Sequence, residues 1–289
     1  MKSRIDFIST KEGTMSLFNY NTLSVSLDKN TRSLTIELNR PELQNSLNTE
    51  MIFELETLFT WLSTHIEIKS IYFTGKGDYF CKGLDDQELA VWSEEKRQKN
   101  FEKVQKLIYS MFYLPQTIVV DLKNGCSGLG VELSMGADIR IASSNCTLHF
   151  DHLQKGIVPS CGGVGFTNAL LGNSIARQWI LSSKKVTSQQ LLSSQTIIES
   201  YTGESTYMEY LESISTQSEI ARIQAKRSLL ESIMPEIDRA IKWEKKFSIA
   251  GMCTGDWKEL AKRGEQASLT SAKEFSSRLK QERAEQLSN

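Results

Sequence analysis

The sequence is poor in the residues that mark several classes of protein. It has four prolines and three histidines in 289 residues, and its five cysteines form no Cys-x-x-Cys pair. The odd cysteine count argues against a disulfide framework or a zinc site and favours reduced thiols. His149 and His152 lie close together, but no cysteine or carboxylate cluster accompanies them, so we expect no metal. The scarcity of proline leaves room for long helices.

Net charge and long apolar runs are lacking too. The net charge is −1, with 39% apolar and 24% charged residues, which is ordinary for a globular protein. No apolar run reaches the roughly 18 residues that a membrane-spanning helix needs. The start, residues 1–6, has no apolar signal-peptide segment. We therefore expect a cytoplasmic protein with no affinity for nucleic acid or membranes.

Apolar periodicity predicts an α/β core over residues 17–200, behind a polar extension at residues 1–16. Alternating apolar residues predict a hairpin at 23–27 and 34–38, and buried strands are expected at 71–73, 118–120, 139–142 and 147–150. Helical spacing predicts helices over 51–62, 101–111 and 129–136. Asn48 or Thr49 would cap the first of them.

The chain after Gly162 is mostly helical in pattern. We expect helices near 163–183, 187–194, 206–215, 217–233 and 236–250. Residues 201–289 then form a helical C-terminal region. No low-complexity linker or repeat separates it from the core, so it would pack on that core or on a neighbouring subunit.

Several catalytic and nucleotide-binding motifs are excluded. The chain has no P-loop, and Gly128-Leu129-Gly130 lacks the third glycine of a dinucleotide fingerprint. The segment from Gly125 to Leu129 is no nucleophile elbow. Cys126 and Cys161 have no evident base partner in sequence and read as small buried apolar residues.

Four segments, in order, resemble the signatures of the crotonase (enoyl-CoA hydratase/isomerase) superfamily. They are residues 38–48, residues 79–85 with the pattern Phe-x-x-Gly-x-Asp, residues 124–142, and residues 156–163; a softer match covers 176–191. The resemblance spans about residues 20–200. It implies a crotonase-like spiral of ββα units with a C-terminal helical region, and homotrimers that often pair as hexamers. It also implies a place in fatty acid metabolism.

The resemblance implies an oxyanion hole made of backbone N–H groups. An enolate oxygen develops negative charge and needs preorganised donors in a dry site. The two donors would be the N–H groups of Lys82 and Leu129, the second at a helix N-terminus. The alternative is that Gly128 and Gly130 only form a tight turn.

Glu132 matches the first of two glutamates that, in hydratases, hold water and move protons. A carboxylate in a partly apolar pocket can act as acid or base near neutral pH. The alternative is a glutamate that only complements the dipole of its own helix. The second glutamate is missing: His152 takes its place, with Asp151 beside it. His152 could act as general base positioned by Asp151, or be a satisfied polar residue in a loop.

The resemblance further implies an acyl-CoA substrate and no permanently bound cofactor. Lys82, Lys245 or Lys246 could meet the phosphates. Backbone contacts from Leu43 to Asn45 and from Phe80 to Lys82 would clasp coenzyme A; the expected binding set is Leu43, Gln44, Asn45, Phe80, Cys81, Lys82, Gly83 and Gly128.

Three hypotheses for function remain open. The leading one is an enoyl-CoA hydratase or isomerase that works through a stabilised enolate. The second keeps the fold but hydrolyses or decarboxylates a thioester of coenzyme A or a carrier protein, using Glu132 with His152 or Asp151. The third is a degenerate paralogue that binds an acyl group or a partner without catalysis.

Overall fold

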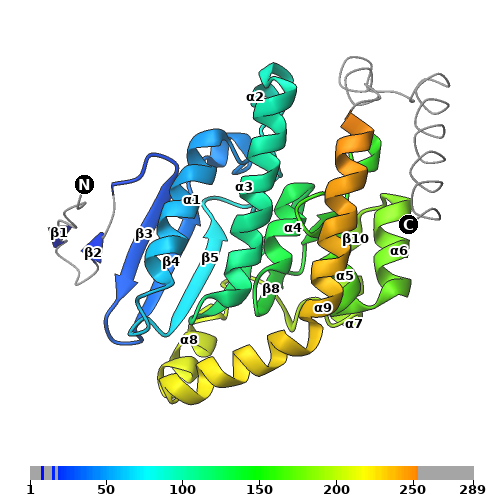
Figure 1. Cartoon of the computed structure of the whole chain (residues 1–289). Coiled ribbons are helices and arrows are strands. Elements are labelled where there is room, and N and C mark those ends of the chain that lie inside the picture. Colours follow the sequence, from blue (N-terminus) through cyan, green and yellow to red (C-terminus); the bar gives the residue numbers. More distant parts are fainter. Residues whose placement is uncertain (1–7, 10–14, 17–18, 253–289) are drawn as a thin grey trace.

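The computed structural model describes residues 8–9, 15–16 and 19–252. Most of the expected N-terminal extension, residues 253–289 and Cys253 lie outside them. Eight strands form the main sheet, in the order β1-β2-β3-β4-β5-β6-β8-β11. Its strands β3, β4, β5 and β8 are labelled in Figure 1. Their bounds are β1 (Ile8–Ser9), β2 (Met15–Ser16), β3 (Leu23–Asp28), β4 (Ser33–Leu38), β5 (Ser70–Gly75), β6 (Thr117–Asp121), β8 (Ile139–Ser143) and β11 (Glu199–Tyr201).

The sheet changes from antiparallel to parallel at β4. Strands β1 to β4 pair antiparallel, whereas β4, β5, β6, β8 and β11 run parallel. A second sheet of three strands has the order β10-β9-β7; its members are β7 (Gly125–Ser127), β9 (Thr147–His149) and β10 (Val186–Thr187). Parallel strands need crossover connections, and helices supply them here.

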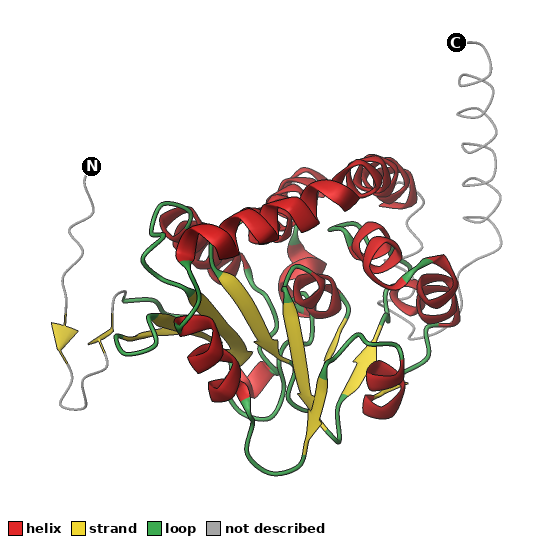
Figure 2. Ribbon diagram, turned by 90° about the horizontal axis from the view of Figure 1, so that it is seen from below, coloured by secondary structure: helices red, strands yellow, loops and turns green. Residues whose placement is uncertain are grey.

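Helices connect the strands and cover the main sheet, most of them on one side (Figure 2). They are α1 (Thr49–Leu62), α2 (Asp86–Val91), α3 (Glu94–Tyr113), α4 (Leu129–Met135), α5 (Gly163–Leu171), α6 (Asn173–Ser182), α7 (Ser188–Ser193), α8 (Tyr207–Ser215) and α9 (Glu219–Met252). Two 3₁₀ turns lie at Pro41–Leu43 and Leu153–Lys155.

Strand β5 lies in the middle of the core and is buried on both faces. Phe73 packs edge-on against Phe59 and Phe80 in the main apolar cluster. Tyr72 points the other way, into a smaller cluster with Leu211 and Ile214 of α8. A strand covered on both faces reads as a continuous apolar run, as residues 71–73 do.

The start of α1 settles the choice between two expected caps. The side chain of Asn48, not Thr49, accepts a hydrogen bond from the Met51 N–H at 2.9 Å. An asparagine there satisfies one of the N–H groups that a first helical turn leaves unpaired.

Two predicted helix boundaries are wrong. The helix expected over 163–183 is two helices, because Gly172 adopts a φ of +83° between α5 and α6. The helices expected over 217–233 and 236–250 are one helix, α9, with Pro235 inside it. The helix bends between its yellow and orange parts (Figure 1). Proline removes one hydrogen bond and kinks a helix, but the neighbouring Met234 and Ile237 are buried and hold both halves in place.

Other elements were not predicted from the sequence. Helix α3 begins at Glu94 rather than near Phe101, and α2 precedes it. The short strands β10 and β11 are additional, since two or three residues carry too little periodicity to be recognised. Among the described residues, no helix combines the length and apolar character needed to cross a membrane. The division into residues 1–16, 17–200 and 201–289 stays a prediction.

Candidate active site

Two glycine-rich turns meet where β7 leads into α4. Gly128 has a φ of +53° and starts α4, while Gly83 has a φ of +104°. A Cβ on Gly83 would lie 3.0 Å from the Leu129 nitrogen, and one on Gly130 would lie 2.2 Å from the Cys81 oxygen. Only glycine lets the two backbones approach so closely. The packing therefore brings the loop of residues 81–84 against the N-terminus of α4, as the oxyanion hypothesis requires.

The structure corrects one member of the expected donor pair. The Lys82 N–H donates to the Gln44 oxygen at 3.0 Å and is therefore already used within the protein. Its neighbour Leu84 lies on the same loop and lines the cavity beside Leu129. The backbone of Leu47 pairs with that of Leu84 in a short parallel bridge. Its two hydrogen bonds run from the Leu47 N–H to the Gly83 oxygen and from the Asp85 N–H to the Leu47 oxygen, so the Leu84 N–H takes no part in it.

The other expected donor keeps its position. Leu129 is the first residue of α4, where the helix offers its N–H group no internal partner. The N-terminal end of a helix also favours negative charge. Leu84 and Leu129 both line the same cavity, so their N–H groups are the candidates for the two backbone donors.

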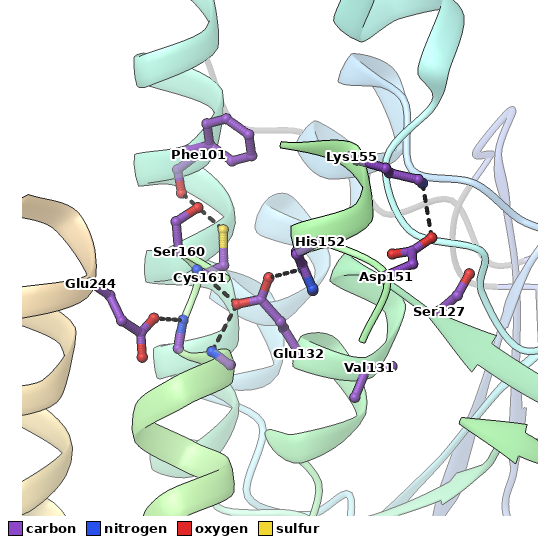
Figure 3. A network of polar contacts seen from close by, with 12 residues as sticks. Phe101, Ser127, Val131, Glu132, Asp151, His152, Lys155, Ser160, Cys161 and Glu244 are labelled. Carbon is purple, nitrogen blue, oxygen red and sulfur yellow. Dashed lines mark hydrogen bonds and ion pairs between the residues drawn. The ribbon is translucent and has the colours of Figure 1, made fainter. Parts of the chain in front are cut away.

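Glu132 is almost fully buried, with 1% of its surface exposed, and its carboxylate has three partners. Its Oε2 accepts from the N–H groups of Cys161 at 2.8 Å and Gly163 at 2.7 Å (Figure 3). Its Oε1 lies 2.9 Å from His152 Nε2. The carboxylate is therefore bound at the N-terminus of α5, which argues against the alternative that Glu132 only complements the dipole of its own helix.

His152 is buried, with 4% of its surface exposed, and pairs directly with Glu132. Because a carboxylate only accepts, its contact with Nε2 places the proton of a neutral ring on that nitrogen. Nδ1 is then an acceptor; it is buried and has no hydrogen-bond partner among the described residues. His152 also lines the cavity. A neutral imidazole held by a carboxylate, with its second nitrogen unpaired, is suited to accept a proton.

Asp151 does not position His152, contrary to the sequence-based hypothesis. Its Oδ2 pairs with Lys155 Nζ at 3.1 Å. Its Oδ1 is buried without a partner among the described residues, next to Gly128, where an added Cβ would lie 2.9 Å from this oxygen. The carboxylate that orients His152 is Glu132. Asp151 instead lines the cavity close to the N-terminus of α4.

The cavity that these residues share is narrow. Its volume is about 20 Å³, which is room for about one water molecule. Its lining is Leu84, Asp86, Leu89, Phe101, Gly128, Leu129, Glu132, Asp151, His152, Lys155, Ile157, Val158 and Ser160. The structure thus brings together Gly128, Leu129, Glu132, Asp151 and His152, five residues that were selected from sequence alone.

An open cleft of about 290 Å³ adjoins this cavity, since Leu84 and Asp86 line both. Three expected coenzyme A contacts, Leu43, Gln44 and Lys82, also line the cleft. Its full lining is Glu42, Leu43, Gln44, Ser46, Lys82, Leu84, Asp85, Asp86 and Gln87.

The side chains of three other expected contacts are fully buried. Asn45 bridges its loop to the next by donating to the oxygens of Lys76 and Tyr79. Phe80 and Cys81 lie in the apolar core. These three residues are not part of the cleft lining, and because their side chains are buried, only their backbone could touch a ligand.

The three lysines proposed for phosphate contacts lie apart. Lys82 lines the cleft, 3.8 Å from Asp86. Lys245 pairs with Glu102 of α3 at 2.8 Å, and Lys246 lies over the Trp243 ring. Of the three, Lys82 alone is placed at the cleft.

One functional candidate escaped the sequence entirely. Glu244, on α9, reaches the same turn as Glu132 and accepts from the N–H groups of Gly162 at 2.7 Å and Gly165 at 2.5 Å. Burial, and next the charge of Glu132, raise the pKa of Glu244 to about 8. No motif surrounds Glu244, and only folding brings it to glycines that lie 82 and 79 residues away in the sequence.

Metal ligands do not gather at this site. Within the part of the chain that the structure describes, no group of three His, Cys, Asp or Glu side chains could hold a metal ion. The described cysteines are free, buried thiols, and burial raises the pKa of Cys81 to about 12.

Most of the chain matches a known protein family. A family model described as enoyl-CoA hydratase/isomerase matches residues 28–262. The chain belongs to this family. The resemblance seen in the sequence and the predicted α/β crotonase-like fold are thereby confirmed.

Individual relatives are distant. The short-chain-enoyl-CoA hydratase of Clostridium acetobutylicum is 24% identical over 225 residues, which cover 76% of this chain and 86% of that protein. The 2,3-dehydroadipyl-CoA hydratase of Escherichia coli is 26% identical over 160 residues, or 55% of this chain. The match to the Escherichia coli hydratase spans only 62% of the length of that relative, and the match to YngF of Bacillus subtilis spans 63%.

Solved structures of the family share the fold. An enoyl-CoA hydratase/isomerase from Mycobacterium paratuberculosis gives a TM-score of 0.78 at 20% identity, covering 85% of this chain and 100% of that one. An enoyl-CoA hydratase from Bacillus anthracis gives 0.71 at 23% identity, covering 87% and 100%. At these identities the likeness establishes the fold and leaves the reaction to be argued from the site.

Proposed function

We propose that this family member hydrates a trans-2-enoyl-CoA, with the enolate held by the N–H groups of Leu84 and Leu129 and protons moved by Glu132 and His152. The observation that carries the proposal is the buried 2.9 Å contact between Glu132 and His152 in a cavity lined by both donors. The open cleft beside it, reached past Leu84, would take the coenzyme A part of the substrate.

The proposed first step adds water to the enoyl group. The water oxygen forms a bond to C3 while His152 Nδ1 takes a water proton. The electrons of the C2–C3 double bond move toward the thioester, and its oxygen becomes an enolate that accepts hydrogen bonds from the two backbone N–H groups. Such donors are typically worth about 10²–10³ in rate each, because they are aimed at the charge that develops.

The second step returns the proton. C2 of the enolate takes a proton from the Glu132–His152 pair, and the product is a 3-hydroxyacyl-CoA with no net gain or loss of protons. Glu132 holds the imidazole and stabilises the charge it gains, while backbone N–H groups fix Glu132 itself. An isomerisation would share the enolate but begin with removal of a proton from the substrate.

The test is turnover of crotonyl-CoA. Its enoyl absorbance should fall when enzyme is added, and Glu132→Gln should abolish most of that change. Measurable coenzyme A binding without turnover of any thioester would reject the hydratase and select the degenerate acyl-binding paralogue.

A second candidate, hydrolysis or decarboxylation of a thioester, is favoured by one observation: a histidine with an unpaired Nδ1 stands where hydratases use a glutamate. His152 could activate water for attack on the thioester carbonyl, and the same two donors would hold the tetrahedral oxyanion. An acyl-CoA panel read for free thiol and carbon dioxide separates these reactions from hydration.

A further inference from the structure

Glu244 and Glu132 approach the same turn from opposite sides (Figure 3). Glu132 lies on α4 and Glu244 on α9, and both are at least nine-tenths buried. Between them runs the turn of residues 161–165, which includes the first residues of α5. The two carboxylates therefore hold one short piece of backbone between two distant parts of the chain.

The N–H groups of this turn are divided between the two carboxyl groups. Those of Cys161 and Gly163 donate to Glu132 Oε2, at 2.8 and 2.7 Å. Those of Gly162 and Gly165 donate to Glu244, at 2.7 and 2.5 Å. The N–H groups that one carboxyl group holds are therefore neighbours in the chain of those that the other holds.

Glycine makes this double hold possible. Gly162 has a φ of +108°, and an added Cβ would lie 1.9 Å from the Phe166 ring. A Cβ on Gly163 would lie 2.8 Å from the Glu132 side chain, and one on Gly165 would lie 2.9 Å from Ala240 of α9. The glycines remove the side chains that would keep α9 and α4 away from the turn.

We propose that Glu244 is a positioning residue: by holding the N–H groups of Gly162 and Gly165, it fixes the turn that fixes Glu132, and through Glu132 the orientation of His152. The inference of a role in catalysis rests on the proposed function. The hold on the turn stands on the contacts alone.

Glu244 acts through the turn and does not touch the reacting atoms. It is not part of the lining of the cavity that holds Glu132, Asp151 and His152, as far as the described residues go. Removing its carboxylate would leave two buried N–H groups without their acceptor, and such groups are costly to leave unpaired. The turn would then shift, and Glu132 would shift with it.

The cleft proposed for coenzyme A should not sense this change. Its lining comes from residues 42–46 and 82–87, none of which contacts Glu244 among the described residues. Loss of Glu244 is therefore expected to lower kcat while KM stays nearly unchanged. Misplacement of a catalytic group by about 1 Å can cost on the order of 10² in rate, so we expect a fall of that size for Glu244→Ala.

Three further variants make the experiment specific. Glu244→Gln keeps the shape and one acceptor and should retain more activity than Glu244→Ala. Glu236→Ala changes an exposed glutamate on the same helix. Glu54→Gln changes another buried carboxylate, one that accepts from the N–H groups of Asn21 and Thr22, away from the site.

Amide hydrogen exchange is the readout that needs no activity. Glu244→Ala should speed exchange in residues 161–165 in the full-length protein, whereas Glu54→Gln should speed it near residue 22 and Glu236→Ala nowhere in the turn. Circular dichroism would verify that each variant is folded, and Glu244→Gln serves if the alanine variant is not.

Three results would overturn the proposal. The first is unchanged exchange across the turn in both Glu244 variants. The second is a rise in KM of the Glu244 variants without a fall in kcat. The third is a fall in kcat of Glu236→Ala as large as that of Glu244→Ala. If the wild-type protein turns over no enoyl-CoA, the proposed hydratase function fails, while the exchange measurement still decides whether Glu244 holds the turn.

Discussion

At the scale of single residues, the site contains one glutamate and one histidine where a pair of glutamates was expected. The position expected for the second glutamate holds His152, which contacts the first, Glu132. Two carboxylates close together repel, whereas a carboxylate accepts a hydrogen bond from an imidazole N–H group. The proposed acid–base pair is thus a carboxylate that orients a histidine.

Replacing His152 tests this pair. We expect His152→Gln to lower kcat by about 10²–10⁴, the usual contribution of a positioned acid or base, as measured with crotonyl-CoA. His149→Gln is the matched control, since His149 is a nearby histidine whose Nε2 contacts the Ser183 oxygen instead. Equal activity in the two variants would remove His152 from the mechanism.

The proposed oxyanion donor, the N–H group of Leu129, can be removed while the helix is kept. Leu129 is the first residue of α4, a position where proline is favoured although it lacks an N–H group. Leu129→Pro should therefore reduce kcat by about 10²–10³, the usual cost of one lost donor. Leu129→Ala, which keeps the N–H group, should stay much more active. Similar kcat values for the two would show that this N–H group does not bind the oxyanion.

At the scale of elements, the N-terminus of α5 is the unusual feature. It receives Glu132 from α4 and Glu244 from α9, where one acidic partner is the common arrangement. The helix end favours negative charge, but burial and the neighbouring charge of Glu132 oppose a second one. The pKa of Glu244 is accordingly raised from its usual 4.5 to about 8, against the lowering effect of the backbone donors. The buried thiol of Cys161 beside them also has a raised pKa.

This raised pKa predicts a pH dependence of stability. Below pH 4.5 Glu244 is protonated in both the folded and the unfolded chain, and its contribution is fully present. As pH rises toward 8 the unfolded chain has released the proton and the folded one has not, so the contribution is lost. The free energy of unfolding of the wild type, relative to Glu244→Gln, should thus fall between these values and level off above them. Urea titrations at a series of pH values measure it; a flat difference would contradict it.

At the scale of the whole molecule, the fold places two cavities side by side and leaves apolar residues on its surface. Leu84 joins the reaction cavity to the open cleft. Exposed apolar side chains include Leu181 on α6 and Ile220 and Leu229 on α9, which are 64%, 69% and 72% exposed. Exposed apolar groups on helices are common in contacts between subunits.

The predicted homotrimer or hexamer is a property of this scale. Light scattering after gel filtration should give a mass three or six times that of the 32.7-kDa chain. Leu229→Glu and Ile220→Glu should lower that mass if these side chains lie between subunits. A stable 32.7-kDa species in the wild type at micromolar concentration would contradict the assembly.

Much of this protein is determined locally and was predicted from the sequence. Alternating and helical apolar patterns placed β3, β4, α1, α4 and α8, because each element buries one face whatever its neighbours are. The glycine pattern at 128–130 and Glu132 mark a turn and a helix start that depend on few residues. The family, the fold class and five residues of the cavity follow from such local signals.

Tertiary structure decided what depends on distant contacts. Pro235 kinks α9 without ending it, because buried neighbours on both sides outweigh the lost hydrogen bond. The proposed oxyanion donor is the N–H group of Leu84 and not that of Lys82, because the Lys82 N–H group donates to the Gln44 oxygen of a neighbouring loop. Glu132, rather than the adjacent Asp151, orients His152, and Glu244 reaches the site from α9. No local pattern encodes these pairings, since each partner is chosen only when packing brings far-apart segments together.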